Sequence, residues 1–220
     1  MHLLQPQTEV NISSLVSTLS SSNSDTSRPQ VQLLPWANLQ TESEQVDWLI
    51  LHFNQWFSHL NVCLVKGDFE PEYFPATNDV PARIQFAHGF FNSALHEISH
   101  WTIAGDKRRL LPDLGYWYAP DGRTAEQQAL FERVEIKPQA IEWMFSKAFG
   151  RKFRVSLDNL TGDGGDGSSF KDNVYAEVQR YFNGETTLPR DAKHFIECIC
   201  ACTRTGKILQ ANEFEREMLD

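Results

Sequence analysis

The decisive stretch of this 220-residue chain is Ala94-Leu95-His96-Glu97-Ile98-Ser99-His100-Trp101. It lies within residues 83–104, which contain no proline and repeat apolar side chains at three- and four-residue spacings. This pattern predicts a helix with a wide apolar surface, followed by Gly105 where a C-cap glycine is common. Because such a helix must bury its surface, we expect it to lie at the centre of the fold.

The two histidines of this stretch predict a metal site. His96 and His100 are four residues apart, so both imidazoles lie on one face of the helix and can reach one ion. In metallopeptidases with the pattern His-Glu-x-x-His, the Glu is the general base, which makes Glu97 the candidate catalytic residue. The alternative is a pair of core histidines that bond to backbone or carboxylates. Burying two imidazoles and a carboxyl group without partners would cost free energy, and a bound cation would remove this cost. This consideration favours the metal site over the pair of core histidines.

A catalytic ion needs a third ligand and an open position. A second long helix is predicted over residues 125–148, and on it Glu132 and Glu135 share a face. Glu135 is the first choice because it stands between the apolar residues Val134 and Ile136, and Glu132 is the alternate. A solvated carboxylate is the other interpretation of either residue.

The remaining elements follow from periodicity and turn-forming residues. Further helices are predicted at residues 42–59, 170–182 and 193–203, strands at 61–67 and 153–156, and irregular segments at 68–81, 107–123 and 161–169. Pro138 predicts a kink in the second long helix, or two helices meeting there. The fold class is therefore α+β: a mostly helical single domain with a small sheet and a zincin-like His-Glu-x-x-His helix.

The amino-acid composition of the first 30 residues differs from that of the rest of the chain. Residues 1–30 are polar and Ser-rich, and cannot bury enough apolar area to offset their ordering entropy, so we expect a flexible arm. Residues 31–220 form the predicted metal-binding domain. The 15 Phe and 6 Trp predict a core or cleft rich in aromatic rings.

The net charge of −9 disfavours direct binding to nucleic acid. We find no run of apolar residues long enough for a membrane span and no signal-peptide pattern, so a cytoplasmic protein is expected. The four cysteines include the run Cys198-Ile199-Cys200-Ala201-Cys202. Three buried thiols are the favoured interpretation, with metal binding or oxidation as the alternative.

Several residues around the motif are candidates for binding substrate: His88, Tyr116, Tyr118 and Arg123. His88 is predicted two turns before His96 on about the same helix face, although a packed helix histidine would explain it too. Core packing would equally explain the tyrosines. Basic residues gather in the middle third of the chain, from Lys107 to Arg154, and form either a solvated face or a docking surface for an acidic partner.

Several runs together resemble the elongation factor P hydroxylase family, over roughly residues 45 to 205. They are Phe86-Ala87-His88-Gly89-Phe90-Phe91-Asn92-Ser93-Ala94-Leu95-His96-Glu97-Ile98-Ser99-His100-Trp101, Gly115-Tyr116-Trp117-Tyr118, Pro120-Asp121-Gly122-Arg123, Val134-Glu135-Ile136-Lys137-Pro138-Gln139-Ala140 and Ser156-Leu157-Asp158-Asn159-Leu160. The order and length of these runs make the resemblance more specific than His-Glu-x-x-His alone.

The resemblance implies an enzyme that hydroxylates the modified lysine of elongation factor P after that lysine has received a β-lysyl group. It implies a divalent metal at the two histidines and a downstream carboxylate, with the acidic elongation factor P as the partner. Hydroxylating an unactivated carbon requires oxygen activation, so iron is favoured, although zinc can occupy such a site in a purified sample. A zinc metallopeptidase and a metal-stabilised adaptor that binds a translation factor remain the alternatives.

Overall fold

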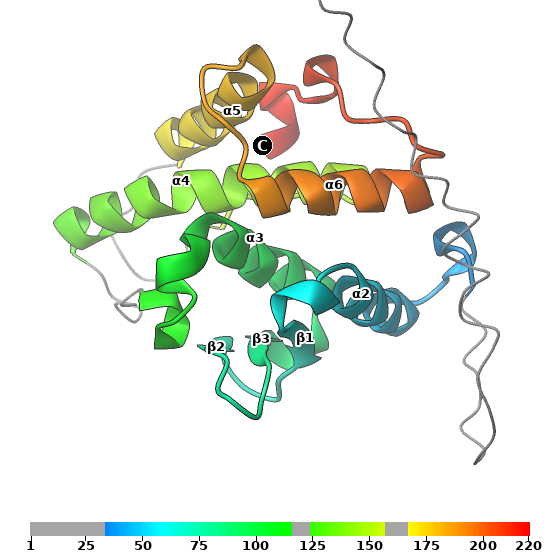
Figure 1. The fold of residues 1–220 in the computed structure, drawn as a ribbon. Helices are drawn as coiled ribbons and strands as arrows, with labels where there is room; N and C mark the ends of the chain where they lie inside the picture. The colour runs from blue at the N-terminus through cyan, green and yellow to red at the C-terminus, as the bar shows by residue number, and fades with distance from the viewer. Residues whose placement is uncertain (1–33, 116–123, 157–166) are drawn as a thin grey trace, which may run out of the picture. The chain divides into compact units, whose positions relative to one another are not determined.

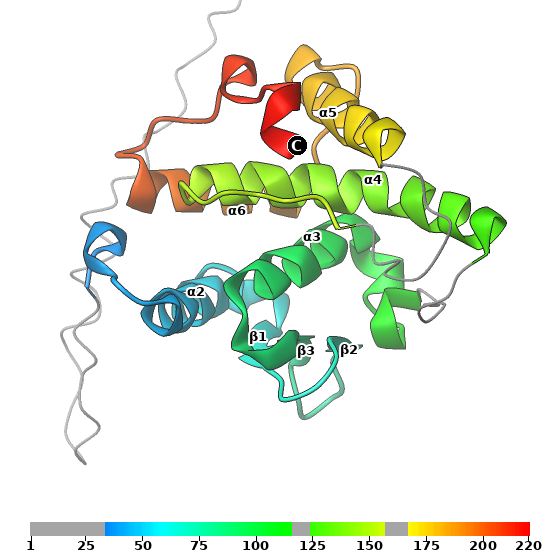
Figure 2. The same cartoon turned by 180° about the vertical axis from the view of Figure 1, so that it is seen from behind.

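The helix that carries the His-Glu-x-x-His motif, α3 (Phe91–Arg108), lies between the sheet on one side and helices α4 and α6 on the other (Figures 1 and 2). This computed structural model describes residues 34–115, 124–156 and 167–220. Leu34–Asp220 forms one compact unit, in agreement with the predicted single domain. The predicted arm at residues 1–30 lies outside the described residues.

The predicted start of the motif helix is wrong. Residues Ala82–Phe86 form strand β3, and a 3-10 turn at Ala87–Gly89 separates it from α3. Ala82, Ile84 and Phe86 are buried in alternation with their neighbours, which is the two-residue period of a strand. At the other end, Gly105 (φ 67°) interrupts the helical backbone within α3, which then continues to Arg108, instead of following the helix as a C-cap.

The sheet has three strands in the order β1-β3-β2. Strand β1 (Val62–Lys66) is confirmed and runs parallel to β3, with Leu64 beside Ile84. Strand β2 (Glu72–Phe74) pairs antiparallel with β3 in the segment predicted to be irregular. With only three residues among prolines, β2 is too short for a periodic signal, and its hydrogen bonds come from the partner strand.

The other helices surround α3. Helix α2 (Glu42–Trp56) packs against β1, and α4 (Ala125–Ala148) packs along α3. Helix α5 (Ser168–Asn183) lies on the side of α4 that faces away from α3, while α6 (Arg190–Thr203) contacts both α3 and α4 (Figures 1 and 2). The other 3-10 turns are Trp36–Asn38, Ser58–Leu60, Pro112–Gly115, Ala211–Glu213 and Arg216–Leu219.

Helix α4 matches its predicted boundaries. Thr124 begins it with a capping box, in which its hydroxyl accepts from the N–H of Gln127 and its own N–H is bonded by the Gln127 side chain. The helix continues through Pro138 as one element, so of the two predicted alternatives, a kink or two helices meeting there, the second is wrong. A single α4 can therefore present side chains to α3 from both sides of the proline.

The predicted strand at residues 153–156 is also wrong, since this segment pairs with no strand in the part of the chain that the structure describes. The backbone of Ser156 instead bonds the side chain of Gln139, donating to Oε1 at 3.0 Å and accepting from Nε2 at 2.7 Å. One glutamine thus supplies the donor and acceptor that a neighbouring strand would have offered.

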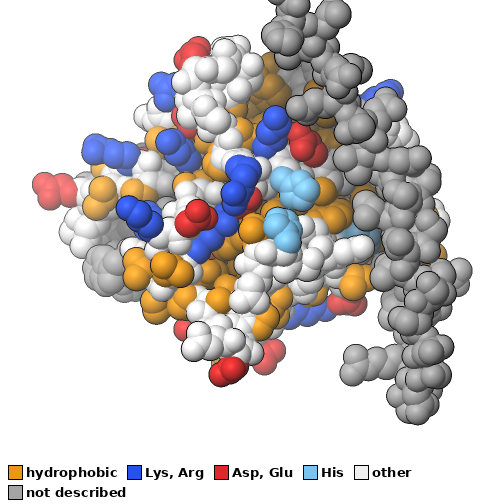
Figure 3. Space-filling view, in the orientation of Figure 1, with side chains coloured by type: hydrophobic (Ala, Val, Ile, Leu, Met, Phe, Trp, Pro, Cys, Tyr) orange, Lys and Arg blue, Asp and Glu red, His pale blue; other side chains and the backbone are white. Residues whose placement is uncertain are grey.

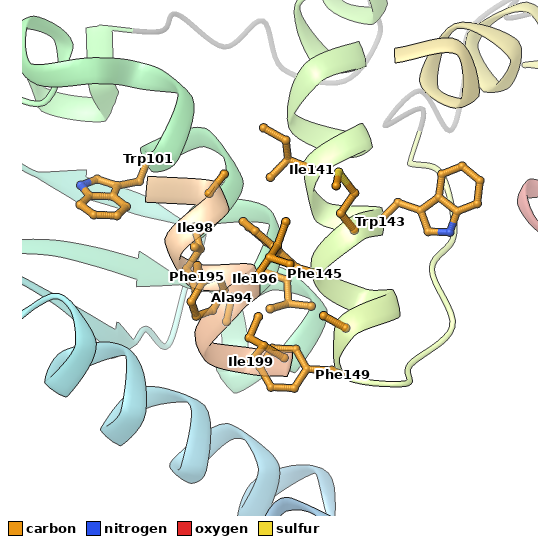
Figure 4. Packing of buried hydrophobic residues seen from close by; sticks show 14 of the residues in the cluster. Ala94, Ile98, Trp101, Ile141, Trp143, Phe145, Phe149, Phe195, Ile196 and Ile199 are labelled. Carbon is orange, nitrogen blue, oxygen red and sulfur yellow. The ribbon is translucent and has the colours of Figure 1, made fainter. Parts of the chain in front are cut away.

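The core is aromatic, as predicted. Ala94 and Ile98 of α3 lie near side chains of α4 and α6 (Figure 4). The ring of Trp101 packs edge to face against Phe53 and Phe57 instead. The rings of Phe145 and Phe195 pack edge to face with centroids 4.8 Å apart. Burying each such side chain stabilises the fold by about 1.5–3 kcal/mol, so the apolar contacts among α3, α4 and α6 hold α3 and α4 in fixed relation.

The three clustered cysteines differ in exposure, which corrects the interpretation of three buried thiols. Cys200 is buried, Cys198 is half-buried and Cys202 is exposed, and all are free thiols. Burial raises the pKa of each thiol, that of Cys198 to about 12, which disfavours the reactive thiolate. Among the described residues, no helix is long and apolar enough to cross a membrane.

Candidate metal centre

The two imidazoles of the motif point to one place beside α3. His96 and His100 lie one turn apart, with their Nε2 atoms 3.1 Å from each other. His100 is buried, whereas His96 keeps 20% of its side-chain surface exposed. The helix spacing thus brings both imidazoles together as predicted, and solvent reaches the pair on the side of His96.

Glu135 comes to this place from α4. Its Oε1 lies 3.3 Å from His100 Nε2, and its Oε2 lies 3.7 Å from His96 Nε2. Among the described residues, His96, His100 and Glu135 are the group whose ligand atoms gather closely enough to hold one ion. The alternate, Glu132, is not part of this group. Its Oε1 accepts from Gln128 Nε2 at 3.1 Å.

The distances fit a divalent cation. Bonds of about 2.1 Å separate two ligand atoms by about 3.0 Å at right angles and by about 3.4 Å at tetrahedral angles. The separations of 3.1 Å between the two Nε2 atoms and 3.3 Å between His100 Nε2 and Glu135 Oε1 fall in this range. The second carboxylate oxygen, Oε2, lies 3.7 Å from His96 Nε2. Two imidazoles and one carboxylate are also a ligand set that leaves coordination positions open.

The apolar neighbours of Glu135 do not fully explain why its side chain points inward. Ile136 is partly buried against the core, but Val134 is 44% exposed, so flanking apolar residues are not what turns Glu135 inward. The better signal is helical spacing: Glu135, Gln139 and Glu142 are four and three residues apart and all three are buried. They form one polar line on the inward side of α4.

Glu142 was missed by sequence reasoning. Its Oε2 lies 2.8 Å from His96 Nδ1, the ring nitrogen that faces away from the other two ligands. A carboxylate in this position holds the proton on Nδ1 and leaves Nε2 as the electron-pair donor. The seven-residue spacing from Glu135 could have revealed it.

The electrostatics of the cluster favour a cation. Burial lowers the pKa of His96, but the hydrogen bond and charge of Glu142, with the charges of Glu135 and Glu97, outweigh it and raise this pKa to about 10. Burial also raises the pKa of Glu142 against the pull of His96. The surrounding carboxylates therefore hold a proton among the imidazoles, and they would attract a metal ion in the same way.

Glu97 lies on α3 next to His96 and is partly buried. Burial raises the pKa of its carboxyl, with His96 and His100 opposing the shift and Glu135 and Glu142 adding to it. Glu97 thus shares the electrostatic environment of the cluster without being one of its three converging ligands.

The predicted substrate-binding residues have mixed outcomes. His88 is exposed in the turn before α3, with φ 50° and its ring 5.9 Å from that of Phe90. It therefore does not share a helix face with His96, and that premise is wrong. Tyr116, Tyr118 and Arg123 lie outside the described residues, so their roles stay predictions.

The basic residues of the middle third divide into two groups. Arg109 and Arg151 serve the fold: Arg109 stacks on Trp101 and pairs with Asp191, and Arg151 stacks on Phe91. Lys107, Arg133 and Lys137 are exposed instead. In Figure 3, Lys and Arg side chains gather mainly over the side where α5 and the beginnings of α4 and α6 lie, with acidic side chains among them.

The part of the chain that carries the residues of this cluster is similar to known proteins. A family profile described as elongation factor P hydroxylase matches residues 52–214. A protein of Haemophilus influenzae named elongation factor P lysine hydroxylase is 46% identical over 169 residues, which are 76% of this chain and 94% of the relative. Both matches agree with the resemblance carried by the motif helix and its flanking runs. The chain that builds this His-His-Glu cluster therefore belongs to the elongation factor P hydroxylase family.

Proposed function

We propose that this protein is a metal-dependent oxidoreductase that hydroxylates the β-lysyl-modified lysine of elongation factor P. The observation that carries the proposal is the position of His96, His100 and Glu135, which converge as a ligand set inside the region matched by the family. The name of the Haemophilus relative supports the reaction and the substrate protein.

In this proposal, His96, His100 and Glu135 hold the metal, which we take to be iron. A redox metal bound there would supply the activation of dioxygen that hydroxylation of a carbon requires, whereas zinc would not. One oxygen atom of dioxygen enters the C–H bond and the other leaves as water, so the reaction consumes an external reductant.

The residues around the ligands orient them and handle protons. Glu142 keeps the proton of His96 on Nδ1, so that Nε2 is available to the ion. Glu97 is the proposed catalytic residue, which orients a ligand, relays a proton or binds the lysyl amine. The exposed side of His96 is the proposed direction from which the modified lysine approaches, with His88, Tyr116, Tyr118 and Arg123 as proposed substrate contacts.

The proposed partner is elongation factor P itself. An acidic partner would complement the exposed basic residues, which include Lys107, Arg133 and Lys137, and this attraction would raise the rate of encounter. A substrate that belongs to translation favours a location in the cytoplasm. The net charge of −9 supports direct recognition of a protein rather than nucleic acid.

The second candidate is a zinc metallopeptidase, which the His-Glu-x-x-His pattern favours by itself. In that reaction Glu97 would be the general base for a metal-bound water. Both candidates use the same ligands, so product analysis must separate them.

The deciding experiment incubates β-lysylated elongation factor P with the iron-loaded protein, air and a chemical reductant, and measures its intact mass. We expect a gain of about one oxygen atom with the wild-type protein. His96→Ala should abolish the gain, and His59→Ala, which removes an exposed histidine outside the cluster, should retain it. No gain with the wild-type protein, together with cleavage of a peptide, would favour the peptidase.

A further inference from the structure

Gln139 is a buried residue that touches both the metal centre and a distant backbone segment. It lies one turn after Glu135 on α4 and is 1% exposed. Its Nε2 donates to Ser156 O at 2.7 Å and to Glu135 Oε2 at 3.5 Å, while its Oε1 accepts from Ser156 N at 3.0 Å. Both ends of the amide are thus engaged.

The backbone of Ser156 decides which way this amide faces. A glutamine side chain has a donor end and an acceptor end that can exchange places by rotation. Rotated by half a turn, Gln139 would set its Oε1 against Ser156 O and its NH2 group against Ser156 N–H, so both bonds would be lost. The observed orientation is therefore enforced, and it directs the second N–H of Nε2 toward Glu135.

We propose that Gln139 is a positioning residue for Glu135. By donating to Oε2, it holds that oxygen and leaves Oε1, the atom nearer to His100, directed at the metal site. The inference rests on the metal site of the proposed function. It extends the account to a residue that makes no contact with the ion, and it links the carboxylate ligand to the chain segment around Ser156.

The same helix offers a matched comparison. Gln128 is also buried on α4, and its Nε2 also donates to a carboxylate, but that carboxylate is Glu132, which is not in the ligand group. Replacing either glutamine with methionine removes an amide of similar length and volume. A loss specific to the metal site should therefore follow only from the change at Gln139.

The experiment titrates Co²⁺, a spectroscopic probe for the site, into metal-free protein. Gln139→Met should bind Co²⁺ at least about tenfold more weakly than the wild-type protein, as expected when the partner of a metal ligand is removed. Its visible absorption bands should also change, because they report the ligand arrangement, which a purely structural role would not alter. Gln128→Met should match the wild-type protein in both respects.

A second measurement requires no variant. In a zinc titration of the wild-type protein followed by NMR, one of the two side-chain amide protons of Gln139 should shift strongly, and the other, held by Ser156 O, should shift little. Equal Co²⁺ affinity and spectra for Gln139→Met and the wild-type protein, or no shift of either proton, would overturn the positioning role alone. Failure of the wild-type protein to bind Co²⁺ would overturn the proposed metal site as well.

Discussion

Helix α3 carries two buried clusters of charged groups, and they differ in how well their charges balance. At its C-terminal end, Arg109 lies 3.7 Å over the ring of Trp101, donates to Trp101 O and pairs with Asp191 at 2.7 Å. Near its middle, His96 and His100 are surrounded by the carboxylates of Glu97, Glu135 and Glu142.

The C-terminal cluster is complete without any ligand. Asp191 accepts from Arg109 and from Arg190, so its carboxylate and the guanidinium of Arg109 compensate each other. Breaking such a pair leaves an isolated buried charge, which is strongly destabilising. This cluster therefore joins the end of α3 to the start of α6.

The central cluster is incomplete, because three carboxyl groups surround two imidazoles and burial raises the pKa of two of these carboxyls, Glu97 and Glu142. Buried charges in proteins are paired or bind metals. A balanced buried cluster contributes to stability, whereas an excess of carboxyl groups beside buried imidazoles marks a cation site. Variants that separate the two effects test this difference.

The largest expected effect is on metal binding by His100→Ala. Removing one of three ligands should weaken divalent metal binding by at least about 1,000-fold, or about 4 kcal/mol, as measured by isothermal titration calorimetry. The metal-free variant should keep the helical circular dichroism of the wild-type protein, so that the lost affinity reports the missing ligand and not unfolding. A variant that binds within about tenfold of wild type would contradict the assignment of His100.

Arg109→Ala should lower the stability of the fold and not the affinity for metal. It leaves Asp191 without its less exposed partner and should lower the free energy of unfolding by about 3 kcal/mol, measured by denaturant titration. Lys107→Ala, on the exposed part of the same helix end, is the control and should change stability by less than about 0.5 kcal/mol. Similar stabilities for the two variants would show that the Arg109 cluster does not support the fold.

Glu142→Gln tests the carboxylate behind His96. An amide holds the Nδ1 proton less strongly than a carboxylate, so metal affinity should fall by about 10- to 100-fold. Glu132→Gln should leave the affinity unchanged, because Glu132 does not reach the ligand group. A larger loss with Glu132→Gln than with Glu142→Gln would reverse the two roles.

The smallest expected effect is the pH dependence of Asp191→Asn. Burial raises the pKa of Asp191, but the hydrogen bonds and charges of Arg190 and Arg109 outweigh it and lower this pKa below its ordinary value. The ionised carboxylate therefore stabilises the fold above the unfolded pKa of about 3.9, and this contribution is lost as the pH falls through the lower folded pKa. The advantage of the wild-type protein, about 1 kcal/mol at neutral pH, should be constant from about pH 5 to 7 and shrink below about pH 4. An advantage that grows in acid would contradict the sign.

The sequence predicted the convergence of the candidate ligands better than the elements around them. His96 and His100 follow from helical spacing alone, and α4 follows from its periodicity and cap. The start of α3 could not be placed because Arg83 and Gln85 alternate with apolar residues in a run that also fits a helix. Strand β2 depends on its partner, which local sequence does not encode.

The polar line on α4 is a signal that the sequence contains and that would have pointed to Gln139 and Glu142. Glu135, Gln139 and Glu142 share helical spacing, and a line of long polar residues on a helix that must be buried is itself a signal. The bond between Gln139 and Ser156 joins residues seventeen positions apart through a side chain and a backbone. Neither propensity nor periodicity predicts such a pairing.

The central claim is that the unbalanced cluster of α3 and α4 holds a divalent metal through His96, His100 and Glu135. Its most direct test is the metal content of the wild-type protein and of Glu135→Gln, both purified without oxygen after incubation with Fe²⁺. The account predicts about one ion per wild-type chain and little in the variant. A wild-type protein that stays free of metal, or a variant that retains the same content, would contradict it.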